Sequence, residues 1–239
     1  MPEAFFVSLC LCGSIDMING VRLKVCGLTS LVDAEAADAV GADYLGFIFY
    51  PKSPRGITLR QYAAMKDILP PRKRVAVTVE PSVADLAALV KQDFDRHQIH
   101  FNADTPVATI AAWSQLVGKN HLWLAPKLPP GQGVKPEWLP LADTFLLDTF
   151  HADKFGGTGE TGDWDKFKRH QLDHDMKTWV LSGGLNAANV DAAVSATGAK
   201  FIDVNSGVEL SPGVKSPDKL RVFVLALHNA TKHGNPSYS

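Results

Sequence analysis

The feature that most constrains the fold is a repeated alternation between short β-branched or aromatic runs and longer amphipathic stretches. Such alternation is typical of strand and helix units that build a parallel sheet. The pattern predicts eight strands that begin about 26 residues apart, close to the roughly 30 residues of a compact strand-helix-strand unit. These strands cover residues 21–26, 44–49, 74–79, 97–101, 121–126, 144–149, 178–182 and 200–205.

The segments between the strands predict the outer layer of the fold. Most carry helical patterns, whereas residues 129–142 are rich in proline and glycine and support only a short helix. Eight such units predict an α/β protein with a single closed (β/α)8 barrel, a TIM barrel, and 239 residues fit the ~250 typical of that fold. The alternative is an open doubly wound sheet, but no G-x-G-x-x-G motif follows the first strand.

The chain shows no linker, and we expect one barrel domain over residues 21–230. We interpret residues 1–20 as a poorly ordered extension or as sequence upstream of a true start at Met17, and residues 231–239 as a disordered tail. The apolar run near the start is weak as a secretory signal because no basic residue precedes it and Glu3 stands there instead. It is also shorter than the roughly 20 residues that span a bilayer, so we expect no membrane association.

Charge and cysteine content narrow the class of protein. The 24 basic and 25 acidic side chains give a net charge of -1 without a basic cluster, which argues against nucleic acid as a partner. The three cysteines, Cys10, Cys12 and Cys26, cannot form a disulfide framework, and we expect a reducing, cytoplasmic location. Cys10 and Cys12 lack a matching second pair, so we expect no metal site. The sequence is compatible with a monomer or a homodimer.

The barrel fold predicts where an active site would lie. In barrels of this kind, catalytic residues stand at the C-terminal ends of the strands and in the loops that follow. Unusual polar residues and glycines of this chain fall at those places. They are Cys26, Arg55, His100, Asp148, Gly183, Gly184, Asn205, Ser206 and Gly207.

Glycine-containing loops after the last two strands indicate an anion site. Gly183 and Gly184 precede Asn186, a predicted helix N-cap, and Ser206 and Gly207 lie in the neighbouring loop. Glycines let the backbone approach a phosphate closely, and barrel enzymes commonly hold phosphate at these two loops. The pair of loops therefore predicts a phosphate site, although one such loop alone would indicate only a turn.

Three side chains could carry the chemistry of such a site. Arg55, between Pro51 and Pro54, is either a solvated loop residue or a fork for a carboxylate. Asp148 is either a structural cap or a general acid, and the glycine-rich loop 155–164 after it could cover the site. Cys26 shares a strand face with Lys24, and a nearby cation could lower its pKa so that it acts as a nucleophile or a general base.

An ordered set of motifs carries a family resemblance. KVCGLT, GFIFYPKSPR, QIH, LLDT, GGTGETGDW, LSGGLNAANV and DVNSGVELSPGVKSPDKL follow one another along nearly the whole predicted barrel. Together they closely resemble the phosphoribosylanthranilate isomerases of tryptophan biosynthesis. The resemblance implies an Amadori rearrangement of N-(5'-phosphoribosyl)anthranilate to 1-(2-carboxyphenylamino)-1-deoxyribulose 5-phosphate, without metal or organic cofactor.

The resemblance also implies roles for the candidate residues. Asp148 would be the general acid that opens the ribose ring, and Cys26 the general base that removes the proton from C2. Arg55 would hold the anthranilate carboxylate, and His100 would contact the substrate. The phosphate would be bound around Gly183, Gly184, Asn205, Ser206 and Gly207.

The chain departs from the family pattern at three places. Phe101 stands where relatives usually have glycine, which predicts either another path for the following loop or a ring near the substrate. Glu160 replaces a residue that is basic in many relatives, and Gly162 replaces an aromatic residue. These changes leave the acid, the base and the arginine in place.

Two other functions compete with the isomerase. Lys24 could form a Schiff base in a sugar-phosphate aldolase, although closure of the barrel predicts that Asp203 pairs with this amine and keeps it protonated. A barrel that binds phosphosugars without turnover is the other alternative. The sequence also leaves open whether the related precursor of histidine synthesis is a second substrate.

Overall fold

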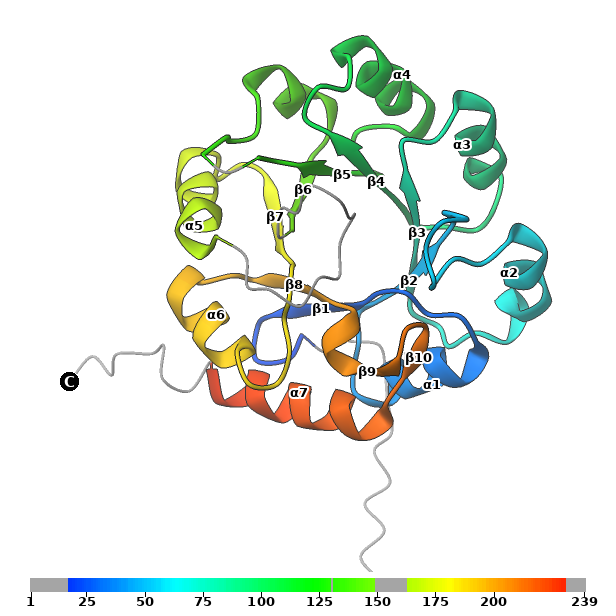
Figure 1. The fold of residues 1–239 in the computed structure, drawn as a ribbon, viewed down its shortest axis with the longest axis vertical. Coiled ribbons are helices and arrows are strands. Elements are labelled where there is room, and N and C mark those ends of the chain that lie inside the picture. Colours follow the sequence, from blue (N-terminus) through cyan, green and yellow to red (C-terminus); the bar gives the residue numbers. More distant parts are fainter. Residues whose placement is uncertain (1–16, 130, 149–162, 231–239) are drawn as a thin grey trace, which may run out of the picture.

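The computed structural model describes residues 17–129, 131–148 and 163–230, which form a closed barrel of eight parallel strands surrounded by helices (Figure 1). The predicted TIM barrel is confirmed, and every strand lies within two residues of its predicted bounds. The strands are β1 (Arg22–Val25), β2 (Tyr44–Ile48), β3 (Lys73–Val79), β4 (Arg96–Asn102), β5 (Leu122–Lys127), β6 (Thr144–Leu147), β7 (Thr178–Leu181) and β8 (Phe201–Val204).

The outer layer consists of α-helices and short 3-10 helices. The α-helices are α1 (Leu31–Ala39), α2 (Leu59–Met65), α3 (Val83–Val90), α4 (Val107–Val117), α5 (Trp164–Asp173), α6 (Val190–Thr197) and α7 (Pro217–Ala230). The 3-10 helices are η1 (Lys66–Ile68), η2 (Pro136–Leu141) and η3 (Ser206–Val208). The proline-rich connection thus forms only a 3-10 helix, as its composition predicts.

Helix starts follow from capping side chains. Ser30, Thr58, Ser82 and Asp163 each accept a hydrogen bond from the backbone N-H three residues ahead. This bond satisfies one of the donors that a helix leaves unpaired in its first turn. The predicted N-cap Asn186 is wrong, because its Oδ1 accepts from the N-H of Ala188 in a turn and α6 begins only after Asn189.

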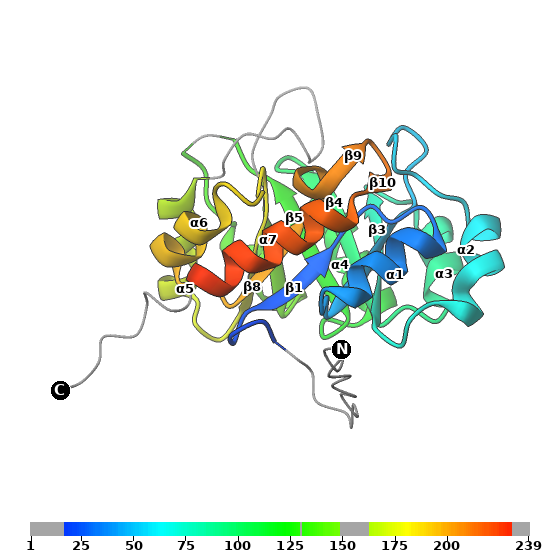
Figure 2. The same cartoon turned by 90° about the horizontal axis from the view of Figure 1, so that it is seen from below.

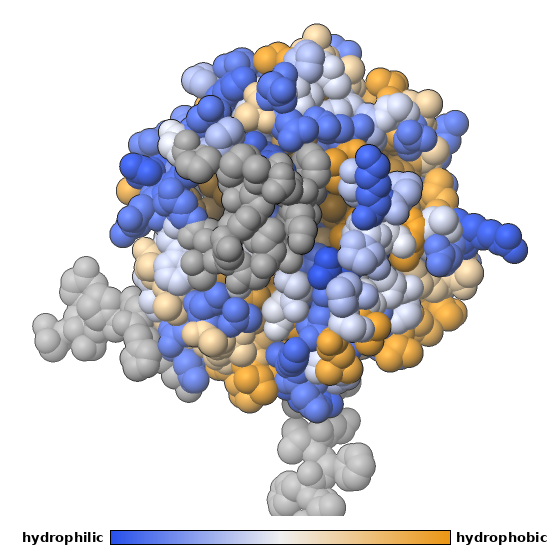
Figure 3. Space-filling view, viewed as in Figure 1, coloured by the Kyte–Doolittle hydropathy of each residue, from blue (hydrophilic) through white to orange (hydrophobic). Residues whose placement is uncertain are grey.

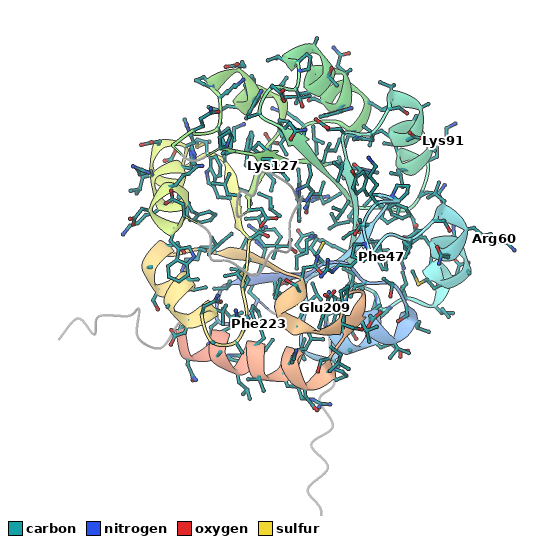
Figure 4. The ribbon with its side chains drawn as sticks, in the orientation of Figure 1. Phe47, Arg60, Lys91, Lys127, Glu209 and Phe223 are labelled. Atoms are coloured by element: carbon teal, nitrogen blue, oxygen red, sulfur yellow. The ribbon has the colours of Figure 1, made fainter. Side chains whose placement is uncertain are left out.

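The alternation of side chains along the strands creates two cores. Inward residues such as Tyr44, Trp123 and Phe201 pack inside the barrel, with ring centroids 5.1 to 5.2 Å apart. Residues between them point outward and form the larger core under the helices, which Phe223 of α7 joins from the outside (Figure 4). The inner core fills the part of the barrel interior toward the N-terminal ends of the strands. The polar inward residues lie near the C-terminal ends.

Phe101 belongs to the outer core, so the predicted ring near the substrate is wrong, whereas another path of the following loop stays a prediction. Strand β4 continues through it to Asn102, and its ring packs against Trp113 and Trp138 at centroid distances of 6.0 and 5.2 Å. The physical reason is strand parity, since Phe101 follows the inward residue His100 and must face the helices.

A hairpin that the sequence pattern did not predict rises beside the barrel mouth. It consists of β9 (Glu209–Ser211) and β10 (Val214–Lys215), which pair antiparallel between β8 and α7. Figure 2 shows this hairpin on the same end of the barrel as the C-terminal ends of the strands. It therefore adds side chains to the predicted active-site face.

The ends of the described chain pack against the barrel. Within the predicted extension, Ile18 is buried in the outer core and Asn19 Nδ2 donates to the carbonyl of His228 at 3.1 Å. Residues 1–16 of the predicted extension and the predicted tail lie outside the described residues. No helix in the described ranges is long and apolar enough to cross a membrane.

Candidate active site

A pocket opens at the C-terminal ends of the strands, where the sequence predicts the site. Hydrophilic side chains surround much of the barrel mouth on this face (Figure 3). Eight of the nine candidate residues line the pocket, namely Cys26, Arg55, His100, Asp148, Gly183, Gly184, Asn205 and Ser206. Gly207 is not among the lining residues but directly follows Ser206 in the chain. The structure thus gathers residues from six different strand ends into one cavity.

The thiol cluster, which we define as Lys24, Cys26 and Asp203, occupies the barrel interior at the base of the pocket. Barrel closure aligns Lys24 of β1 with Asp203 of β8. Lys24 Nζ donates to Asp203 Oδ1 at 2.9 Å, and the two side chains are 0% and 6% exposed. The predicted ion pair is therefore confirmed. It keeps the amine protonated, which removes the basis for a Schiff-base role of Lys24.

The thiol of Cys26 is buried, and burial raises its pKa. The Lys24 ammonium lowers the pKa of this thiol, but burial has the larger effect. The prediction that a neighbouring cation depresses the pKa below its ordinary value is therefore wrong, since desolvation disfavours the thiolate more than the cation favours it. At neutral pH the thiol holds its proton most of the time.

Gly46 on β2 makes room for the thiol cluster, and the sequence reasoning missed it. A Cβ atom at this position would lie 3.0 Å from Lys24 Cε and 3.1 Å from Cys26 Sγ. Gly46 sits on the inward face of a buried strand, where a side chain would normally fill the barrel. A glycine at an inward strand position therefore signals a close approach by neighbouring side chains.

The rim cluster, which we define as Arg55, Glu209 and Lys215, joins the loop after β2 to the hairpin. Arg55 donates to Glu209 through Nε at 2.9 Å and Nη2 at 2.7 Å, so the fork already holds a carboxylate of the protein. Lys215 Nζ donates to Glu209 Oε1 at 2.8 Å and to Asn205 Oδ1 at 2.9 Å. Figure 4 marks Glu209 beside the barrel mouth.

The rim cluster has a different proton balance from the thiol cluster. Burial would raise the pKa of Glu209, but hydrogen bonds from Arg55 and Lys215 lower it overall. Burial also lowers the pKa of Lys215, and Glu209 only partly opposes this shift. The sequence reasoning missed Glu209 and Lys215 because both lie in the hairpin, whose path does not follow from strand periodicity.

His100 lines the pocket as a neutral imidazole. Burial, together with the charge of Lys24, lowers its pKa to about 4. Its Nε2 lies 2.8 Å from the amide nitrogen of Gln98, two residues earlier on the inward face of β4. With the amide nitrogen of Gln98 facing it, His100 Nε2 is assigned as the acceptor, which places the ring proton on Nδ1.

The two glycine loops are held together by close backbone contacts. Gly183 and Gly184 have φ angles of +93° and +66°, which disfavour other residues. The carbonyl of Gly184 accepts from Asn189 Nδ2 at 2.9 Å. A Cβ on Gly207 would lie 2.0 Å from the carbonyl oxygen of Leu185, so only glycine permits this approach of the two loops.

Asp148 directly follows β6 and lines the pocket. The glycine-rich loop after it, including Glu160 and Gly162, lies outside the described residues apart from its last two, so the predicted cover over the site stays a prediction. Within the described ranges, no group of three His, Cys, Asp or Glu side chains is placed to hold a metal ion.

Comparison with known proteins identifies the family. A sequence profile described as N-(5'phosphoribosyl)anthranilate (PRA) isomerase matches residues 23–226. The N-(5'-phosphoribosyl)anthranilate isomerase of Magnetococcus marinus is 35% identical over 219 residues, which cover 88% of this chain and 96% of the relative.

Solved structures agree with the sequence match. Phosphoribosyl anthranilate isomerase from Thermus thermophilus superposes with a TM-score of 0.72 at 29% identity, covering 87% of this chain and 99% of that one. A second isomerase structure, in complex with reduced 1-(o-carboxyphenylamino)-1-deoxyribulose 5-phosphate, gives a TM-score of 0.67 at 30% identity, covering 87% and 99%. The chain therefore belongs to the phosphoribosylanthranilate isomerase family and is an isomerase of tryptophan biosynthesis.

Proposed function

We propose that Cys26 is the general base and Asp148 the general acid of this isomerase. The observation that carries the proposal is that one pocket is lined by both side chains and by the glycine loops after β7 and β8. The two side chains enter from β1 and from the end of β6, which are separated by two strands around the barrel. A sugar bound between them would expose different atoms to the acid and the base.

The reaction then proceeds in two proton transfers and a tautomerisation. Asp148 in its acid form protonates the ribose ring oxygen, the C1-O bond breaks, and the nitrogen lone pair forms the C1=N bond of a Schiff base. The Cys26 thiolate removes the proton from C2, and the electron pair forms C1=C2 while the nitrogen regains its lone pair. The resulting enolamine becomes the ketone when its hydroxyl proton is lost and C1 gains one.

The raised pKa of Cys26 fits a base that must later return its proton. A thiol with a raised pKa is a stronger base once ionised, although less of it is ionised at neutral pH. The Lys24 ammonium offsets part of this cost by favouring the thiolate. The thiol cluster therefore ties the amount of active base to the charge of Lys24.

The phosphate of the substrate binds at the loops after β7 and β8. Gly183, Gly184, Asn205 and Ser206 line the pocket, and the tight contact at Gly207 joins the two loops. Arg55 holds the anthranilate carboxylate from the pocket wall while Glu209 fixes its orientation. The neutral ring of His100 faces the same cavity and contacts the substrate there. The enzyme works in the cytoplasm, in keeping with its biosynthetic reaction.

The direct test follows turnover of phosphoribosylanthranilate, generated in situ, by loss of its fluorescence. Cys26→Ala and Asp148→Asn should each lower kcat by roughly 100- to 10,000-fold, the usual contribution of a general acid or base. Asp218→Asn, a change of an exposed aspartate on α7, is the matched control and should keep full activity. Folded Cys26→Ala or Asp148→Asn protein with wild-type kcat would refute the assigned role.

A further inference from the structure

A buried amide group in the pocket has no partner for its oxygen. Gln98 is 1% exposed and lines the cavity from β4. Its nitrogen donates to His100 Nε2, but its Oε1 is buried without a hydrogen-bond partner in the described part of the chain. A buried acceptor without a partner destabilises the folded state, so its presence in a native protein calls for an explanation.

The position of Gln98 separates it from the other unpaired buried atoms. The described residues contain six such side-chain atoms, in Asp43, His97, Gln98, Trp138, Trp164 and Gln171. Gln98 is the one among them that lines the active-site pocket. Its oxygen therefore lies where a ligand can reach it.

The side chains aligned with Gln98 on the neighbouring strands make no hydrogen bond to this oxygen. The residues aligned with Gln98 are Val77 on β3, an aliphatic side chain, and Trp123 on β5, which belongs to the inner core. The contact with His100 uses the nitrogen end of the amide. The nitrogen of Gln98 faces the ring at 2.8 Å, and the oxygen is the end without a partner.

The substrate brings the donors that the pocket lacks. Phosphoribosylanthranilate carries ribose hydroxyl groups, each of which can donate one hydrogen bond. We propose that Gln98 is a substrate-binding residue whose amide oxygen accepts a hydrogen bond from a hydroxyl of the ribosyl group, while its amide nitrogen holds His100. This assignment rests on the proposed use of the pocket for that substrate.

A binding role and a structural role make opposite predictions for Gln98→Met. Methionine has a similar volume but no polar end, so it removes the unpaired oxygen from the interior. If the oxygen serves the substrate, Gln98→Met weakens binding while the thermal midpoint of unfolding changes little, because loss of the donor to His100 offsets the gain from removing the unpaired oxygen. If Gln98 mainly holds the barrel together, the midpoint falls and ligand affinity in the folded enzyme is unchanged.

The experiment measures the Kd of the reduced product analogue, 1-(2-carboxyphenylamino)-1-deoxyribitol 5-phosphate, for wild type and Gln98→Met. We expect the Kd to rise about 10- to 100-fold, the cost of leaving a buried hydroxyl without its acceptor. The inhibition constant of inorganic phosphate, which occupies only the loops after β7 and β8, should not change. Leu146→Met, an interior change below the pocket, should leave both constants at their wild-type values.

The outcomes separate this inference from the proposed function. If wild-type enzyme fails to bind the analogue, the proposed use of the pocket is wrong. If wild type binds and Gln98→Met binds equally well, the inference about Gln98 is wrong and the pocket assignment stands. Should Gln98→Met not fold, the wild-type crystal structure with the analogue decides, because a sugar oxygen must then lie within hydrogen-bond distance of Gln98 Oε1.

Discussion

The thiol cluster and the rim cluster each bury carboxylate and ammonium groups beside the same pocket, but they hold protons differently. In the thiol cluster, the pKa values of Lys24, Cys26 and Asp203 are all raised. In the rim cluster, the pKa values of Glu209 and Lys215 are both lowered. The two clusters thus contain similar kinds of side chain, but their pKa values shift in opposite directions.

Burial and neighbouring charges together explain the difference. In the thiol cluster, burial raises the pKa values of Cys26 and Asp203 more than the Lys24 ammonium lowers them, and the two acidic groups raise the pKa of Lys24 against its own burial. In the rim cluster, hydrogen bonds from Arg55 and Lys215 outweigh burial and lower the pKa of Glu209, whereas burial outweighs Glu209 and lowers the pKa of Lys215. Desolvation thus decides three of the five shifts, and neighbouring charges decide the other two.

The two clusters have different roles, because one controls a proton and the other holds the geometry of the pocket. The thiol cluster sets how readily Cys26 gives up its proton. The rim cluster fixes the fork of Arg55 and the amide of Asn205, and so shapes the wall of the pocket. We therefore expect changes in the thiol cluster to act mainly on kcat and changes in the rim cluster mainly on KM.

The largest effect is expected from Lys24→Met. This change leaves Asp203 buried at 6% exposure without its cation, which should lower the free energy of unfolding by about 3 to 5 kcal/mol. It also removes the charge that favours the Cys26 thiolate, so kcat should fall along with stability. Urea unfolding and fluorescence assays of turnover measure both.

The double variant Lys24→Met with Asp203→Leu is the control for this prediction. Replacing both members of a buried pair by apolar residues restores much of the lost stability. Activity should stay low in the double variant, because the thiol still lacks its cation. Full recovery of kcat in the double variant would show that Lys24 acts on stability alone.

A smaller effect is expected from Glu209→Gln. The change removes the charge that holds Arg55 and Lys215 but leaves an oxygen that can accept, so the loss should be about 2 kcal/mol, within the range for hydrogen bonds to charged groups. KM should rise severalfold because Arg55 loses its orientation, while kcat should stay within a factor of about three. A fall in kcat with an unchanged KM would remove the distinction between the two clusters.

The sequence predicts the thiol cluster better than the rim cluster, for a physical reason. Strand periodicity assigns Lys24 and Cys26 to one face, and closure of a parallel barrel brings β8 beside β1, so the pairing with Asp203 follows. Glu209 and Lys215 lie in a hairpin between β8 and α7. Their approach to Arg55 depends on tertiary folding of an irregular segment that carries no periodic pattern.

The same contrast applies to single residues of the site. Parity along β4 would have assigned Phe101 to the outer core and Gln98 to the pocket, because both follow from the inward position of His100. The pKa of Cys26 could not be predicted, because it depends on the balance between burial and the charge of Lys24. Patterns along the chain give the direction of a side chain, whereas proton affinity depends on the full set of neighbours.

The smallest predicted effect concerns the coupling between the two clusters. Lys215 lowers the pKa of Cys26, so Lys215→Gln should raise that pKa further and move the rise of kcat/KM with pH to higher pH. Activity should therefore fall at neutral pH, and the loss should vanish at high pH where the thiol is ionised. Lys219→Gln is the matched control, because it makes the same charge change on an exposed side chain. Lys219 Nζ also donates to Glu209, at 2.6 Å from the backbone carbonyl oxygen of that residue. This variant should leave the pH profile of kcat/KM unchanged. A loss for Lys215→Gln that persists unchanged at high pH would mean that the rim cluster acts on the site through geometry alone.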